Sequence, residues 1–215
     1  MANLRQGSFG QYYGSFYHES ETLTMSEMEV NAQYIYRYLK SKGWTTNAIA
    51  GLLGNLQAES SINSGRWQSE DVGNMSMGYG LVQWTPASKY IEWCVYNDLS
   101  DPSQIDHNLA RIIYEVENNL QWIRTNLYSI SFSEFTKSTE NVGYLARAFL
   151  LNYERPADQS ATVQAYRSEL AENWYKVIGG TTPKPNPSNT SKKRKSKFML
   201  LHGARKRRET WIRTK

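Results

Sequence analysis

Three carboxylates lie close together in the first third of the chain, and their setting could support acid–base chemistry. Glu59 follows an apolar run with helical spacing, and Glu70 and Asp71 follow it in a polar loop. A carboxyl group held against apolar side chains keeps its proton to higher pH, so a buried Glu59 could act as a proton donor. A second carboxylate facing the first, for which Asp71 is our candidate, would complete the pair that hydrolyses glycosidic bonds. Solvated loop charge is the alternative for Glu70 and Asp71.

Glu59 has an alternative interpretation as an exposed residue at a helix C-terminus. A negative charge is unfavourable at that end of the helix dipole. Such a conflict between residue type and local structure is typical of a functional position. The distance between the two carboxyl groups separates retaining from inverting hydrolysis, and the sequence leaves that distance open.

The segment 78–84, Gly-Tyr-Gly-Leu-Val-Gln-Trp, predicts one arm of a tight β-hairpin beside these carboxylates. Gln83 is half-buried in this prediction, and a buried amide needs hydrogen-bond partners. It could bind a sugar or a water, or it could bond the neighbouring loop. Trp67, Tyr79 and Trp84 are candidate platforms for a pyranose ring, and packing in the core is the alternative for each of them.

Metal and cofactor chemistry finds little support in the residue pattern. His18, His107 and His202 are widely separated, with no His/Cys/Asp cluster at ligand spacing. No glycine-rich phosphate loop precedes a helix. The single cysteine, Cys94, excludes a disulfide within the chain and lies on an apolar helical pattern that predicts a core position. We therefore predict no metal and no other cofactor.

Helices must hold these groups in place. Ser26 and Glu29 have the spacing of a capping box that would begin the first helix. Thr45 or Thr46 would cap the second helix, which delivers Glu59 at its C-terminal end. The apolar periodicity continues in this way to about residue 178 and predicts about seven helices. The expected fold class is α+β and mainly helical, with a small β-hairpin at the active-site cleft.

Composition divides the chain into four parts. Residues 1–24 form a Tyr-rich arm that we expect to be flexible because of Gly7, Gly10 and Gly14, and the alternative is that it docks on its own domain or on a partner. Residues 25–180 form the globular domain. Residues 181–191 are a linker rich in Pro, Ser, Thr and Asn, and residues 192–215 are a basic C-terminal stub.

The charge of the chain follows this division. Residues 181–215 hold 12 Lys or Arg and one acid, while residues 1–180 hold 13 Lys or Arg and 19 acids. Because the domain itself is acidic, nucleic acid is an unlikely partner. No apolar run approaches the roughly 20 residues of a membrane span, and no secretory signal is expected at the N-terminus.

Four motifs together resemble one known family. They are GNLQAESSIN at 54–63, Trp67-Gln68, GYGLVQWTP at 78–86 and YERPA at 153–157. In these motifs the chain resembles the tail-associated lysozyme domain of small short-tailed phages that infect Gram-positive bacteria. The likeness covers about residues 24–180.

The resemblance implies a lysozyme-like fold that cleaves the β-1,4 bond between N-acetylmuramic acid and N-acetylglucosamine, with Glu59 as the catalytic acid. It implies a virion tail component whose partners are bacterial peptidoglycan and other phage tail proteins, and which digests the host wall locally during genome entry. Fuller members continue into a zinc peptidase, whereas here the linker leads into the basic stub, so we expect a lysozyme-only form. A non-catalytic wall-binding or structural tail protein is the alternative.

Overall fold

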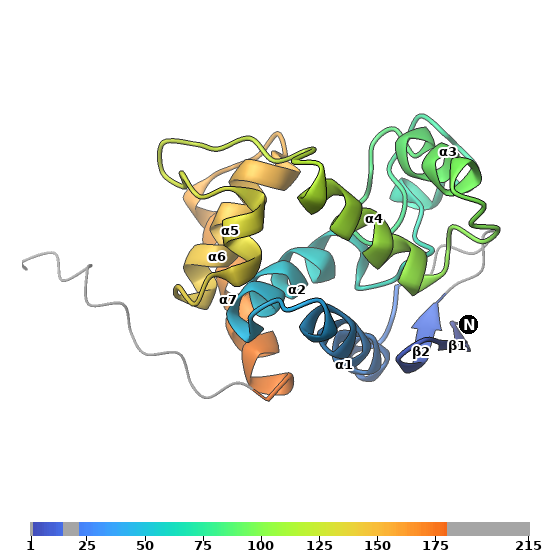
Figure 1. Ribbon diagram of the computed structural model, residues 1–215, viewed down its shortest axis with the longest axis horizontal. Coiled ribbons are helices and arrows are strands. Elements are labelled where there is room, and N and C mark those ends of the chain that lie inside the picture. The colour runs from blue at the N-terminus through green and yellow to red at the C-terminus, as the bar shows by residue number, and fades with distance from the viewer. Residues whose placement is uncertain (1, 15–21, 180–215) are drawn as a thin grey trace, which may run out of the picture. The chain divides into compact units, whose positions relative to one another are not determined.

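The computed structural model describes residues 2–14 and 22–179, so the predicted linker 181–191 and basic stub 192–215 lie outside the described residues. The expected mainly helical α+β fold is confirmed for the described part (Figure 1). None of its helices is long and apolar enough to cross a membrane. The elements in chain order are β1 (Asn3–Gly7), β2 (Gly10–Gly14), α1 (Met25–Ser41), α2 (Thr46–Ser60), a 3₁₀ turn (Gln68–Glu70), α3 (Ser88–Tyr96), α4 (Ile105–Glu117), α5 (Phe132–Lys137), α6 (Val142–Phe149), a π-helix (Leu150–Glu154) and α7 (Ala161–Val177).

Helix α2 is the centre of the domain. The Thr45 side chain accepts a hydrogen bond from the Ala48 amide at its N-terminus, and the left-handed φ of 54° at Ser61 ends it. Nearly every residue from Ala48 to Leu56 is buried, because α1, α6 and α7 pack around it (Figure 1). A helix that is apolar over most of its circumference is stable only when it is enclosed in this way.

The cap of α1 differs from the prediction. Thr24 is the N-cap and shares a reciprocal capping box with Glu27, so the predicted box of Ser26 and Glu29 is wrong. Both pairs have the required spacing, and the flanking residues decide between them. Leu23 precedes Thr24 and is buried in the same core cluster as Met28, four positions into the helix. Such an apolar pair fixes the chain entry and favours the earlier start.

The two-stranded sheet of the domain lies in the N-terminal segment. Strands β1 and β2 pair in antiparallel register from Asn3↔Gly14 to Gly7↔Gly10. Asn31 of α1 accepts from the Tyr13 amide at 2.6 Å and donates to the Tyr13 carbonyl at 2.6 Å, which fastens the hairpin to α1. Residues 3–14 are therefore not the flexible arm that we expected.

The segment 78–84 is a closed turn and not a strand. Tyr79 pairs with Trp67 and with Trp84 through isolated bridges. The positive φ angles of Gly80 (83°) and Gln83 (51°) bend the chain back within four residues, so pairing cannot extend along the segment. The predicted hairpin arm at this position is corrected accordingly.

Candidate active site

Glu59 lies in the last turn of α2, where that helix meets the 78–84 turn. The next residue, Ser60, is fully buried, and its hydroxyl lies 2.8 Å from the carbonyl oxygen of Leu81. This hydrogen bond ties the end of the helix to the turn. The backbone at Glu59 is therefore held in place relative to the turn.

Arg167 of α7 holds the Glu59 carboxyl. Its Nη2 lies 2.5 Å from Glu59 Oε1, and its Nη1 donates to the Asn55 carbonyl at 2.9 Å. The side chains of Arg167 and Glu59 are 9% and 21% exposed, so the guanidinium is covered while the carboxyl still reaches solvent. The guanidinium only donates, so Oε1 of Glu59 serves as an acceptor here and Oε2 remains for a ligand.

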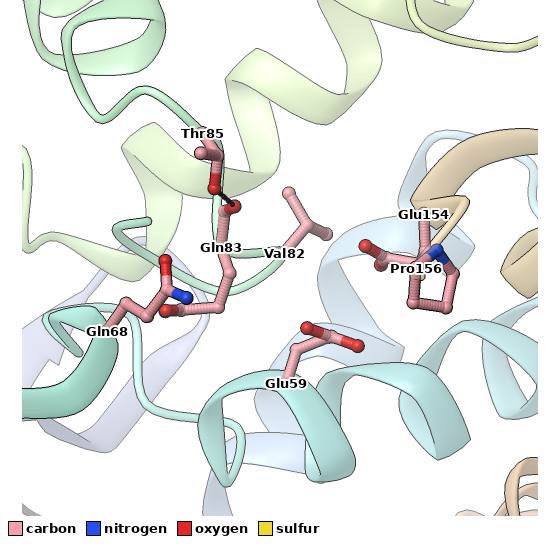
Figure 2. Close-up of a pocket in the computed structure, with 7 residues that line it drawn as sticks. All are labelled: Glu59, Gln68, Val82, Gln83, Thr85, Glu154 and Pro156. Atoms are coloured by element: carbon pink, nitrogen blue, oxygen red, sulfur yellow. Dashed lines mark hydrogen bonds between the residues drawn. The ribbon is translucent and has the colours of Figure 1, made fainter. Parts of the chain in front are cut away.

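A cavity of about 230 Å³ opens in front of Glu59. Most of its wall is polar, with two carboxyls, two amides and a hydroxyl beside two apolar side chains. Figure 2 shows Glu59 and Glu154 directed into the space between α2, the 78–84 turn and the segment after the π-helix. The seven lining residues are Glu59, Gln68, Val82, Gln83, Thr85, Glu154 and Pro156.

A second cavity of about 150 Å³ adjoins the first. Its wall shares Val82, Gln83, Thr85 and Glu154 with the first cavity. Trp84, Lys89, Gln121 and Tyr153 complete its wall. The two cavities together form a trench along the 78–84 turn, rich in the amide, hydroxyl and carboxyl groups that sugar hydroxyls can bond.

Gln83 lines both cavities, as its candidate role requires. Its Nε2 donates to the carbonyl oxygens of Arg66 at 3.0 Å and Gly80 at 2.9 Å, so the structural alternative also applies to this amide. The side-chain oxygen is the group that it can offer to a ligand. Gly78 lies next to this oxygen. A Cβ at Gly78 would come within 3.1 Å of the side-chain oxygens of Gln83 and Thr85.

The three aromatic candidates are buried, and of these Trp84 alone lines a cavity. Trp67 and Tyr79 are fully buried, with ring centroids 4.5 Å apart, so neither ring is open to a pyranose face. Trp84 is 5% exposed, stacks on Tyr90 at 4.4 Å and lines the second cavity with one edge. Trp67 and Tyr79 are therefore core residues, which was the alternative to a sugar platform. Trp84 packs in the core and also contacts the second cavity.

Asp71 lies apart from this group. Its carboxyl is exposed and accepts a hydrogen bond from Asn74 Nδ2 at 2.6 Å. It does not line either cavity beside Glu59. The structure thus brings Glu59 and Gln83 together and leaves Asp71 in its own loop.

Glu154 is the carboxyl that the sequence reasoning missed. It ends the π-helix, and π-helical turns occur often at functional sites. Its Oε1 is shielded from solvent and has no hydrogen-bond partner among the described residues. Burial raises the pKa of Glu154 well above its ordinary value, and the nearby charge of Glu59 raises it further. A carboxylate at the end of an apolar run, the signal that pointed to Glu59, is also present at Glu154 in Leu-Leu-Asn-Tyr-Glu.

A buried hydrogen-bond network behind the second cavity fixes Trp84 and the residue before Glu154. Glu115 of α4 accepts from Trp84 Nε1 at 3.0 Å, from Arg111 Nε at 2.9 Å and from the Tyr153 hydroxyl at 2.5 Å. Burial raises the pKa of Glu115, and these three donors oppose that shift. With all its donors in place, Glu115 positions its neighbours and has no oxygen left for a substrate.

Comparison with known proteins assigns the chain to a family. The family model described as phage tail lysozyme matches residues 30–178. The chain belongs to the phage tail lysozyme family. The matched range contains the whole trench, from Glu59 to Pro156, so the cavities described above lie within the part of the chain that the family model covers.

One relative matches over most of this chain. Morphogenesis protein 1 of Bacillus phage B103 is 52% identical over 165 residues, which is 77% of this chain and 44% of that protein. The chain therefore spans less than half the length of this relative. No group of three or more His, Cys, Asp or Glu residues that could hold a metal ion occurs in the part of the phage tail lysozyme chain that the structure describes.

Proposed function

We propose that this chain is a peptidoglycan hydrolase of the muramidase type, which cleaves the β-1,4 bond between N-acetylmuramic acid and N-acetylglucosamine. The observation that carries the proposal is the Glu59 carboxyl, which faces a polar trench from the end of a buried helix and is held there by Arg167. Membership of the phage tail lysozyme family supports the same activity.

In this mechanism Glu59 gives its proton to the leaving glycosidic oxygen from Oε2, the oxygen that Arg167 does not bond. A water molecule then completes the displacement. The sequence offered Asp71, or a water held by nearby polar groups, for this second function. Because Asp71 lies outside the lining, we assign the water to the polar wall formed by Gln68, Gln83 and Thr85.

The proposal extends to the biological setting of the protein. We propose that the protein is a virion tail component, with other tail proteins as partners, and that it digests the host wall locally during genome entry. The phage tail lysozyme family and the morphogenesis protein of Bacillus phage B103 support this setting.

The decisive experiment is mass spectrometry of the fragments released from purified Gram-positive cell wall by the full chain. A muramidase releases fragments with reducing N-acetylmuramic acid, whereas a glucosaminidase or a transglycosylase leaves different ends. Glu59→Gln should lose about 10²-fold or more in rate, the usual scale for loss of a general acid. The matched control is Glu140→Gln, because Glu140 is exposed and lies outside both cavities.

Two outcomes would contradict the proposal. Wall that is bound but not cleaved by the wild-type chain would indicate a non-catalytic wall-binding module. Wild-type rates in Glu59→Gln, with normal thermal unfolding, would remove Glu59 from the mechanism even if the wall were cleaved.

A further inference from the structure

Glu154 is a buried acid that makes no structural hydrogen bond through one of its oxygens. Buried carboxyls in proteins are normally paired or bonded, because an uncompensated buried charge is very costly. Oε1 of Glu154 is shielded and has no partner among the described residues, yet Glu154 lines both cavities of the trench. A purely structural carboxyl would be expected to use that oxygen to hold a neighbouring group.

The charges around Glu154 come from four parts of the chain. Glu59 on α2 and Glu115 on α4 are acids that disfavour a negative charge on Glu154. Arg167 on α7 and Arg155 in the adjoining segment favour it. The pKa of Glu154 remains well above its ordinary value, because burial has the largest effect and the two arginines oppose it only in part.

The two arginines are also engaged elsewhere. Arg167 donates to Glu59, and Arg155 donates through Nη1 to the carbonyl oxygens of Gln121 and Asn152. Neither forms an ion pair with Glu154 among the described residues. Glu59 and Glu154 thus line one cavity, but Glu59 is paired with an arginine and Glu154 is buried without an ion pair in the described part of the chain. In enzymes such a difference in environment keeps one carboxyl protonated and the other charged.

We propose that Glu59 and Glu154 share one proton, which rests on Glu154 in the free protein and reaches the substrate through Glu59. This inference rests on the proposed glycosidase activity and adds a residue to it. Glu154 is then a positioning residue for the proton, and Glu59 remains the group that touches the leaving oxygen.

The proton and electron pairs balance over one cycle. A sugar that covers Glu59 removes bulk water from its carboxylate, which favours the protonated form of Glu59. The proton passes from the Glu154 hydroxyl to a water in the cavity that both residues line, and that water gives a proton to Glu59 Oε2. Glu59 then gives that proton to the glycosidic oxygen as the bond to the anomeric carbon breaks. Water adds its hydroxyl to that carbon, and its remaining proton returns to Glu154.

The first test is the pH dependence of kcat/KM on soluble glycan strands for the wild type, Glu154→Gln and the control Glu140→Gln. At neutral pH, Glu154→Gln should lose about tenfold or more, because solvent must then supply the proton. As the pH falls, solvent supplies protons at rising concentration, so the rate of Glu154→Gln should approach that of the wild type. A Glu154→Gln profile that matches wild type across the range would overturn the inference.

A second test does not depend on turnover. In protein carrying ¹³C-labelled glutamate carboxyls, the signal that disappears in Glu154→Gln should stay protonated to higher pH than those of exposed glutamates. Glu59→Gln removes a negative charge and releases Arg167, so the Glu154 signal should then titrate at lower pH, while the Glu115 signal stays nearly unchanged. A shared proton is ruled out if the Glu154 signal titrates at the same pH as those of the exposed glutamates. It is also ruled out if Glu59→Gln leaves the titration pH of the Glu154 signal unchanged.

The two proposals fail in different ways. If the wild type releases no sugar from wall or glycan, the proposed function fails, and the carboxyl titration still reports on the pair. If the wild type cleaves and Glu59→Gln does not, but Glu154→Gln keeps the wild-type rate and pH profile, only the shared proton is refuted.

Discussion

The contact between α2 and α7 at Gly54 is the most sensitive support of the site. A Cβ at Gly54 would lie 2.7 Å from the Ala171 amide nitrogen and 2.8 Å from the Arg167 carbonyl oxygen. Ordinary van der Waals contact begins at 3.4 Å, so the two helices must separate before alanine fits at this position. Both obstructing atoms belong to the main chain, and no rotamer change relieves the clash.

The expected size of the effect follows from two opposing terms. Alanine gains up to about 1 kcal/mol over glycine in a helix interior. Overpacking a tight contact costs typically about 1–3 kcal/mol, and the upper end applies where main-chain atoms obstruct. Gly54→Ala should therefore lower the free energy of unfolding by about 2 kcal/mol, which corresponds to roughly 4–8 °C in Tm for a domain of this size.

Gly51→Ala is the matched control on the same helix. Its Cβ would lie 3.0 Å from Leu145 Cβ and 3.1 Å from the Ala146 nitrogen, a looser contact with α6. The gain in helix propensity should offset most of that strain, so we expect a change in the free energy of unfolding within about 1 kcal/mol.

Urea unfolding of both variants measures the difference, with an unchanged m value as the check that the unfolded state is the same. Because α7 carries Arg167, Gly54→Ala should also lower the rate on glycan strands below the unfolding temperature, and Gly51→Ala should not. Two results would refute this reasoning: a Gly54→Ala variant as stable as the wild type, or a Gly51→Ala variant that is less stable than Gly54→Ala. Either would show that the close approach of α2 and α7 does not set the geometry of this site.

Two further predictions concern the charged groups of the site. Burial raises the pKa of Glu154 in the folded state, so the folded protein keeps a proton that the unfolded chain loses above about pH 4.5. Stability should therefore fall as pH rises, by up to about 1.4 kcal/mol per pH unit until the folded-state pKa is passed, and Glu154→Gln should remove that slope from urea unfolding measured across pH. Arg167→Met should lower the free energy of unfolding by about 2 kcal/mol, the scale of a hydrogen bond to a charged group, because Glu59 loses its donor. Equal unfolding midpoints of Arg167→Met and wild type at neutral pH would show that solvent replaces the guanidinium.

Local sequence patterns gave wrong predictions for the cap of α1 and for the N-terminal segment. Thr24–Glu27 and Ser26–Glu29 both have capping-box spacing, and packing of Leu23 with the core selected the first. The glycines of residues 1–14 suggested flexibility, but Gly10 supplies the turn between β1 and β2, with a φ of 116°. The deciding contacts are the packing of Leu23 against the core and the hydrogen bonds between Asn31 and Tyr13, and neither local pattern includes them.

The sequence by itself determined the helical class, the central apolar helix and the acid at its end. Those features depend on periodicity and on residues that are neighbours along the chain, which a sequence displays directly. It also offered Gln83 as a candidate ligand or structural amide, because a buried amide needs partners, and the structure places that side chain on the wall of both cavities.

Only the tertiary structure decided which groups meet Glu59. Arg167 is 108 residues away along the chain, and Glu154 arrives from a different helix end. The proton affinity of a carboxyl depends on its burial and on the charges beside it, and both are fixed by packing between distant segments. The sequence could thus supply an acid, but the fold determined its partners and where the proton resides.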